Sequence, residues 1–421
     1  MVNFNMETMR RLGQKLKPSA RARKIWWWIF FSLSVLNGLC AITAGYAGIV
    51  NPYATAVPAM LALTFPLWII TTVVLFVVEI CVSWRMALVP LLTLIICLGP
   101  ILSNSPVNMV NPKVTDGNRG RTFTLLSFNI AQAYDMRDSV QHGKVEGDGR
   151  APCNPSLTYL IGSGADIVCL QEFPKYINPM SWLRITQEQI DSLNRIYPHH
   201  TATWAESIFS KYPLYPIPFN HKEQEYEPYT AAMVDIQGHK TLLVSVHLKS
   251  FGLSDEDKAI YENVTEGEGR SSLKAARRAL LPKLKTTFRE HASQAREIRR
   301  LIDSLDIENV IVTGDFNDMP DCYAIRTIAG DDFSNSFNVA GRGPIITFHK
   351  NRFYFHIDHT LYRGNMEAIA FRRDDIEYSD HYPIITTFQW RHTARTDREK
   401  LPVIDLIGRD STAGPIGPLP R

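Results

Sequence analysis

The chain has 421 residues, of which 45% are hydrophobic, and it carries a formal net charge of +3 at pH 7. This length excludes a single small domain and leaves room for a membrane region beside one large core. The small net charge gives no indication of an acidic or basic partner, so the positions of the charges along the chain are more informative.

Three apolar runs dominate the N-terminal quarter of the chain. They cover Ile25–Val50, Val57–Val78 and Met86–Leu102. The first two are about long enough to cross a bilayer, and the first opens with Trp26–Trp28, which is typical of a membrane interface. The third run is shorter, and a buried helix of a soluble protein is its alternative interpretation. We predict that all three are transmembrane helices.

The charges around these runs predict an orientation. Residues 1–24 hold seven Lys and Arg but one acid, Glu7, whereas the link Asn51–Ala56 holds no charge. Because basic segments stay on the cytoplasmic side, the N-terminus is expected in the cytoplasm. Three crossings then place everything after Leu102 outside the cytoplasm, in a periplasm or its equivalent, with the protein integral to the inner (plasma) membrane.

The chain therefore divides into five predicted segments. They are a basic cytoplasmic N-terminus (1–24), three transmembrane helices (25–102), a linker (103–121), a soluble domain (122–390) and a flexible C-terminal tail (391–421). Within the soluble domain we predict strands at 122–130, 166–171, 207–210, 231–236, 241–247, 311–313, 345–348, 355–362, 368–371 and 383–390, and helices at 185–196, 273–289 and 295–305. The mixture of elements predicts an α+β fold.

The six cysteines give no metal-binding pattern such as C-x-x-C. Cys153 and Cys322 lie in loop-like sequence and could form a disulfide, a question that the sequence leaves open.

One stretch of the soluble domain carries recognisable chemistry, Ile311 to Asp318. Its apolar start predicts a buried strand, Gly314 ends that strand, and Asp315 and Asn317 follow on one face of extended chain. A carboxylate suits Mg²⁺ and an amide N–H suits a phosphoryl oxygen. The alternative interpretation is an ordinary strand followed by a turn rich in Asp and Asn.

Polar residues recur at other predicted strand ends, which favours the functional interpretation. Each alone has a structural explanation, such as a turn cap or a buried histidine with a partner, but together they supply carboxylates, amides and histidines to one domain. They are Asn129, Glu172, His247, Asp315 with Asn317, Asp358, and Asp380 with His381.

These residues lie in motifs that resemble the endonuclease/exonuclease/phosphatase superfamily, in particular a membrane-anchored bacterial subgroup. The motifs occur in the family's order and cover roughly residues 122–390. They are Leu126-Ser127-Phe128-Asn129, Asp166 to Glu172, Ser207 to Pro213, Ser245-Val246-His247-Leu248, Gly314 to Asp318, Ile357-Asp358-His359 and Ser379 to Pro383.

The resemblance implies a four-layer αββα sandwich with the site at one edge of the paired sheets. Glu172, with Asn129 and Asp380 nearby, would hold Mg²⁺ or Mn²⁺. Asp315 would orient the attacking water and Asn317 would hold the phosphate. The implied histidine roles are a base or phosphate ligand for His381, steadied by Asp358, and a general acid or transition-state donor for His247.

Two stretches depart from the family pattern. His356 stands where many relatives carry Arg, and Trp204-Ala205-Glu206 replaces a common Gly. Glu206 lies where the deoxyribonuclease branch places a carboxylate that pairs with the acid histidine, so a Glu206–His247 pair is one further hypothesis. None of these departures removes a catalytic residue type.

The resulting prediction is a membrane-anchored, metal-dependent phosphoesterase with no predicted protein partner. Its substrate is open between a nucleic acid, a phospholipid head group and an inositol-type phosphate, and between diester and monoester. The alternative is a non-catalytic sensor or scaffold that binds a phosphorylated ligand. A transport module with an accessory domain ranks lower, since only Glu79 and Arg85 lie near the predicted spans.

The segment Leu273–Arg289 is a predicted basic amphipathic helix, interrupted at Pro282. In one interpretation its apolar stripe packs on the domain and its charges are solvated. In the other, the helix lies against anionic lipid.

Overall fold

A computed structural model describes residues 20–108, 121–137, 153–173, 178–203, 206–218, 227–252, 269–350 and 354–391. Most of the predicted N-terminal segment, linker and C-terminal tail lie outside these residues. The chain divides into two compact units, residues 1–46 with 61–101, and residues 47–60 with 102–421. The loop that follows the first apolar helix therefore belongs to the second unit.

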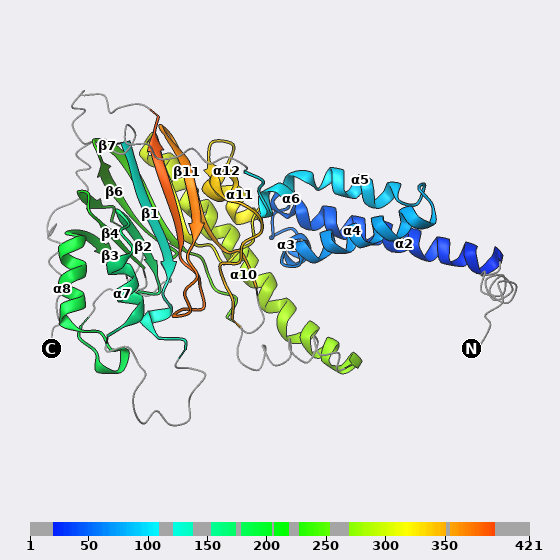
Figure 1. The fold of residues 1–421 in the computed structure, drawn as a ribbon, viewed down its shortest axis with the longest axis horizontal. Coiled ribbons are helices and arrows are strands. Elements are labelled where there is room, and N and C mark those ends of the chain that lie inside the picture. Colours follow the sequence, from blue (N-terminus) through cyan, green and yellow to red (C-terminus); the bar gives the residue numbers. More distant parts are fainter. Residues whose placement is uncertain are drawn as a thin grey trace, which may run out of the picture. The chain divides into compact units, whose positions relative to one another are not determined.

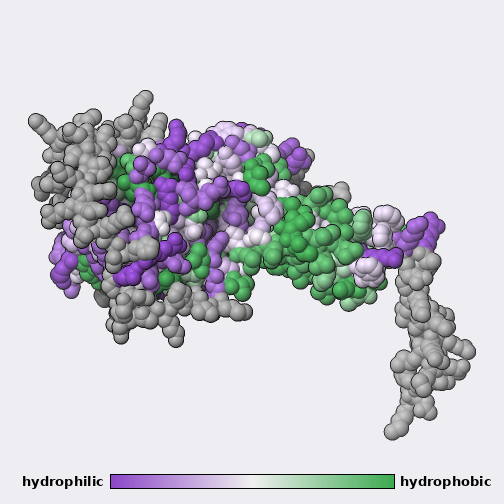
Figure 2. Space-filling model, turned by 90° about the horizontal axis from the view of Figure 1, so that it is seen from above, coloured by the Kyte–Doolittle hydropathy of each residue, from purple (hydrophilic) through white to green (hydrophobic). Residues whose placement is uncertain are grey.

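The first unit is built from apolar helices, α2 (Ala20–Gly45), α4 (Phe65–Val82) and α5 (Leu88–Ile96). Among the described residues, two helices are long and apolar enough to cross a membrane, Lys24–Gly45 and Phe65–Val82. Hydrophobic side chains cover the surface of this unit (Figure 2).

The second and third predicted spans differ from the helices observed. A short helix α3 (Val57–Ala62) precedes α4, because the backbone turns between them. The third run is not one continuous helix: α5 ends at Ile96, and α6 (Leu98–Asn104) begins after Cys97. Pro100 lies in that first turn of α6, where it lacks the N–H that a continuous helix would use.

Polar side chains join the helices of this unit. Ser34 Oγ donates a hydrogen bond to Glu79 Oε1 (2.6 Å), and Asn37 Nδ2 donates to Thr72 Oγ1 (2.7 Å). Glu79 lies in the last turn of α4, near the end of the span as the sequence indicates, and it is buried in the bundle. Hydrogen bonds of this kind hold apolar helices together where no hydrophobic driving force acts between them.

The second unit contains two six-stranded sheets in a mixed α+β fold (Figure 1). The first sheet has the order β11 (Met366–Arg373), β12 (Ile384–Trp390), β1 (Thr122–Asn129), β2 (Ile167–Gln171), β4 (Glu206–Ser210), β3 (His199–Ala202). The second has the order β5 (Leu214–Pro216), β6 (Tyr229–Ile236), β7 (His239–His247), β8 (Asn309–Asp315), β10 (Asp358–Arg363), β9 (Ser334–Asn335).

Three hydrophobic clusters account for the packing of these sheets. One joins the first sheet to α7 (Pro155–Gly162) and α8 (Gln187–Ile196). A second contains side chains from both sheets, among them Leu125 of β1 and Leu243 of β7. The third joins the second sheet to α10 (Gly269–Leu305) and α11 (Tyr323–Ala329). Figure 1 shows α7 and α8 on one side of the strands and α10 on the other.

The remaining helices are short. They are η1 (Ala47–Ile49), η3 (Ala131–Ala133), η5 (Ser181–Leu183) and α12 (Ser336–Ala340). The predicted strand at 345–348 is wrong, since Phe348 makes only isolated bridges. Cys153 and Cys322 are both free thiols.

The two helices predicted on either side of residue 290 are one continuous helix, α10. Pro282 lies inside it and does not interrupt it. Pro282 and its neighbours are exposed, so the carbonyl that loses its partner at the proline remains open to water.

The loop before α3 packs on the second unit. Arg289 of α10 donates to the carbonyl oxygens of Pro52 (3.4 Å) and Tyr53 (3.3 Å). Gly48 of η1 lies so close to α11 that a Cβ there would be 2.4 Å from the carbonyl oxygen of Asp321.

Candidate active site

The strand registers bring the polar strand ends to one edge of the fold. β1 and β2 run parallel, so Asn129 and Glu172 emerge at the same edge of the first sheet. β7 and β8 run parallel with His247 opposite Asp315, and β10 is antiparallel to β8 with Asp358 opposite Asp315. The second sheet therefore places His247, Asp315 and Asp358 side by side.

Gly314 makes this arrangement possible. Its φ is +143°, and a Cβ at this position would lie 2.0 Å from the carbonyl oxygen of Val246 on the neighbouring strand. Only glycine lets β7 and β8 approach so closely just before the His247–Asp315 pair.

The carboxylate of Asp315 is the centre of the cluster. Its Oδ2 lies 3.1 Å from Asn129 Nδ2, 3.5 Å from His381 Nε2 and 3.8 Å from His247 Nε2. Its Oδ1 accepts the backbone N–H of Asn317 at 2.8 Å. Burial raises the pKa of Asp315 to about 7, against the lowering effect of the nearby His381.

The two histidines have opposite electrostatic surroundings. His381 Nδ1 lies 2.9 Å from Asp358 Oδ2. Burial disfavours the charged imidazole, but the carboxylates of Asp358 and Asp315 outweigh it and raise the pKa of His381 to about 10. For His247, burial and the neighbouring His381 lower the pKa to about 3. The protonated His381 and neutral His247 thus flank Asp315.

Glu172 and Asn317 leave their strands in the left-handed region, with φ of +55° and +47°. Non-glycine residues in this region carry strain and cluster at functional sites. Glu172 Oε1 lies 3.3 Å from Asn129 Nδ2 and 3.9 Å from His247 Nε2. Asn317 Nδ2 donates to the carbonyl oxygen of Leu248 at 2.9 Å. Glu172 therefore joins the cluster through its side chain, whereas Asn317 joins it through its backbone N–H to Asp315.

The residues that could hold a metal differ in part from those predicted. Asp315, Asp358 and His381 place ligand atoms within 4.8 Å of one another. Asn129 accepts the N–H of Ala131 with its Oδ1 (3.1 Å), so its Nδ2 faces the carboxylates as a donor rather than a ligand.

Asp380 does not contact Glu172, the residue with which it was expected to share a metal. Its Oδ2 pairs with Lys350 Nζ at 3.1 Å, and no hydrogen bond or ion pair among the described residues joins it to Glu172. The carboxylate oxygens present nevertheless fit the donor preference of a hard divalent cation.

Glu206 does not make the expected pair with His247. It lies fully buried on β4, opposite Gln171, and neither of its carboxylate oxygens has a hydrogen-bond partner among the residues described. Burial and the nearby Glu227 raise the pKa of Glu206 well above its usual range.

Sequence reasoning assigned no role to Asp318 and did not find His291. Asp318 is buried, its carbonyl oxygen lies 3.0 Å from His359 Nε2, and its Oδ2 lies 3.5 Å from His291 Nδ1. His291 Nε2 also lies 2.6 Å from the carbonyl oxygen of Lys249. His291 sits in mid-helix without a motif around it, so only its long-range contacts reveal that α10 supports this loop.

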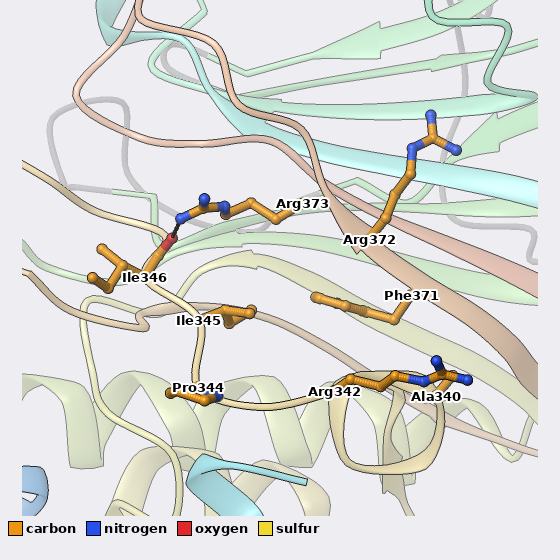
Figure 3. Close-up of a pocket in the computed structure, with 8 residues that line it drawn as sticks. All are labelled: Ala340, Arg342, Pro344, Ile345, Ile346, Phe371, Arg372 and Arg373. Atoms are coloured by element: carbon orange, nitrogen blue, oxygen red, sulfur yellow. Dashed lines mark hydrogen bonds between the residues drawn. The ribbon is translucent and has the colours of Figure 1, made fainter. Parts of the chain in front are cut away.

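A pocket of about 590 Å³ is lined in part by Arg372 and Arg373, and none of the cluster residues lines it. The guanidinium of Arg373 lies 4.2 Å from the centre of the Tyr382 ring. Figure 3 shows Arg373 donating to the carbonyl of Ile346 (2.7 Å), while Arg372 points away from it. Arg372 and Arg373 pair with Asp374 and Asp375. Because their charges are balanced in this way, they do not form a converging anion site.

The fold and the cluster define an α+β domain with an acid–histidine site at strand ends. A family model described as the Endonuclease/Exonuclease/phosphatase family matches residues 126–381, which is more than half of the chain. The protein belongs to this family, whose members are in general hydrolases of phosphoester bonds, and the resemblance inferred from the motifs is confirmed. A second model, a domain of unknown function, matches residues 23–104.

Solved structures of family members are similar to this chain. A Bacteroides vulgatus endonuclease/exonuclease/phosphatase has 16% identity and a TM-score of 0.39, covering 64% of this chain and 99% of its own. A humanized D. rerio TDP2 has 14% identity and a TM-score of 0.40, and the match covers 64% of this chain and 99% of the TDP2 chain. A truncated Caenorhabditis elegans TDP2 has 17% identity and a TM-score of 0.38, covering 64% and 98%. Comparison with curated proteins gives no match.

Proposed function

We propose that the protein is a membrane-anchored, divalent-metal-dependent phosphoesterase whose catalytic unit is a four-layer αββα sandwich. The observation that carries this proposal is the convergence of His247, His381 and Asp358 on Asp315. The three hydrophobic clusters support the layering, because one lies between the sheets and one lies under the helices on each outer face.

The protein groups supply most of what phosphoester hydrolysis needs. Asp315 accepts a hydrogen bond from the attacking water and orients it. The imidazolium of His381, held by Asp358, stabilises negative charge on a phosphoryl oxygen. Asn317 offers a further N–H to the phosphate. His247, a neutral imidazole, donates a hydrogen bond to the leaving oxygen in the transition state.

Mg²⁺ or Mn²⁺ would be held by Glu172, whose Oε1 lies 3.3 Å from Asn129 Nδ2, and would neutralise charge that develops on the phosphoryl oxygens. Glu172 fits this role because its side chain is 35% exposed while its neighbours in the cluster are buried. It thus gives the cluster an opening to solvent.

The contacts of the loop before α3 support three membrane crossings. Pro52 and Tyr53 follow the first span, and they contact Arg289 of the catalytic unit. A loop after one crossing and a domain after the last apolar run share a side only if the chain crosses twice between them. α4 supplies one crossing and α5 with α6 the other, since residues 88–104 extend about 25 Å as helix. With a basic N-terminus in the cytoplasm, the catalytic unit then faces the periplasm or its equivalent.

A substrate panel tests the proposed activity. The full chain in detergent, with Mg²⁺, is assayed on a nitrophenyl phosphodiester, a nitrophenyl phosphomonoester, single-stranded DNA, a phospholipid and an inositol polyphosphate. Turnover of at least one, lost in the His381→Ala variant, is expected. If no substrate is turned over although the folded chain binds a phosphorylated ligand, the protein is instead a sensor or scaffold.

A further inference from the structure

Residues 277–286 of α10 are exposed or half-buried, unlike the apolar positions further along that helix. No described residue between Arg277 and Thr286 is buried, whereas Phe288 and the following apolar positions pack into the core. Leu281 is 42% exposed. Figure 1 shows the first turns of α10 extending past the strands. A helical segment of ten residues that carries leucines is rarely left without a packing partner in a soluble protein.

The charge of the N-terminal half of α10 has one sign. From Arg270 to Arg289 the sequence holds seven Lys and Arg residues and no Asp or Glu. Arg277, Arg278, Lys283 and Lys285 are exposed beside Leu281. Basic residues interleaved with leucines are the pattern of helices that lie in the interface of an anionic bilayer.

The contacts at Arg289 connect α10 to the loop that follows the first apolar helix in the chain. Arg289 bonds the carbonyls of Pro52 and Tyr53, and the guanidinium of Arg296 lies 5.2 Å from the Tyr53 ring. Tyr53 follows the end of α2 by about eight residues, so the chain keeps it within about 28 Å of that end. Arg277 lies about 18 Å further along the helix from Arg289. These chain lengths allow the exposed turns to reach the bilayer surface.

We propose that residues 277–286 of α10 bind the surface of a membrane that contains anionic lipid, on the side that carries the catalytic unit. The leucines enter the interface and the Lys and Arg side chains pair with lipid phosphates. The same helix carries His291, which contacts Asp318 beside the cluster, so lipid binding fixes an element that supports the site. The inference rests on the membrane anchoring of the proposed function, but not on its catalytic activity.

Spin labelling of the full chain tests this inference. A label is placed at Leu281→Cys in a chain whose Cys40, Cys81 and Cys153 are replaced by Ser. One chain per nanodisc is reconstituted in pure phosphatidylcholine or in phosphatidylcholine with phosphatidylglycerol. We expect collisions with a water-soluble nickel reagent to fall by about twofold or more in the anionic discs, while collisions with oxygen rise.

Matched variants separate lipid binding from other causes. The changes Arg277→Gln, Arg278→Gln, Lys283→Gln and Lys285→Gln together should return the label to its level in phosphatidylcholine. A label at Glu188→Cys, an exposed position on α8, should give the same signal in both discs.

Three results overturn the proposal. Equal nickel access at position 281 in both discs rules out an anionic-lipid contact. Protection that needs two chains per disc assigns the surface to a second copy of the protein. A chain that does not enter the discs removes the anchor itself, and the inference with it. Turnover is not part of this readout, so loss of the proposed catalytic activity would leave it intact.

Discussion

The pair of His381 and Asp358 gives the sharpest prediction. Their Nδ1 and Oδ2 atoms are 2.9 Å apart and both side chains are buried. The change Asp358→Asn keeps the shape and an acceptor oxygen but removes the charge. A hydrogen bond to a charged group contributes about 1.5–3 kcal/mol and a neutral one about 0.5–1.5 kcal/mol. The difference of about 1–1.5 kcal/mol corresponds to a loss in kcat of roughly tenfold.

The comparison with His381→Ala makes this prediction specific. Removing the imidazole itself should lower kcat by about 10²-fold or more, the usual scale for a positioned acid or base. The assay is hydrolysis of whichever nitrophenyl ester the full chain turns over, at saturating Mg²⁺.

The control is Asp332→Asn, which removes a carboxylate paired with Arg299 and Arg363 at the opposite end of β10. It should leave kcat unchanged. Equal losses in Asp358→Asn and His381→Ala would refute a positioning role for Asp358, and so would an unchanged kcat in Asp358→Asn.

Three further predictions concern stability and topology. Burial raises the pKa of Asp321 to about 6, so ionisation of this carboxyl in the unfolded chain destabilises the fold as pH rises from about 4 through 6. The variant Asp321→Asn should therefore become more stable than wild type as pH rises, by up to about 3 kcal/mol at pH 7, because Asn tolerates the φ of +62°. Equal melting temperatures of the two chains at pH 7 would contradict this. Gly314→Ala should cost about 3 kcal/mol or more and abolish turnover, because the methyl group would meet the backbone of Val246; a melting temperature near wild type would show that β7 and β8 do not approach so closely. A reporter fused after Trp390 should be active only if it works outside the cytoplasm, and a signal from a cytoplasm-only reporter would mean that α5 with α6 does not cross.

The residues around Asp315 were predictable because local sequence determines them. An apolar strand ending in glycine and followed by Asp and Asn is visible without a structure, and parallel pairing brings such ends together. The prediction that Gly314 ends the strand is wrong, since β8 continues to Asp315. The close approach of Gly314 to Val246 depends on the neighbouring strand.

Long-range packing decided the features that the sequence did not reveal. Pro282 predicted a break in α10, but its exposed position lets the helix continue. The role of His291 depends on Asp318 and Lys249, which are far from it in sequence. Glu206 sits where a family pattern predicts a partner for His247, yet its surroundings leave both oxygens without a hydrogen bond among the described residues. Neither periodicity nor motif spacing carries such information.

Metal dependence of turnover tests the central claim most directly. The full chain is freed of metal with a chelator, and hydrolysis of the best substrate in the panel is measured as Mg²⁺ or Mn²⁺ is added back, for wild type and for Glu172→Gln. We predict no turnover without metal, full recovery with it, and a Glu172→Gln variant that needs at least tenfold more metal for half-maximal rate. Full turnover in chelator, or identical metal curves for both chains, would contradict the assignment of this cluster as a metal-dependent phosphoesterase site.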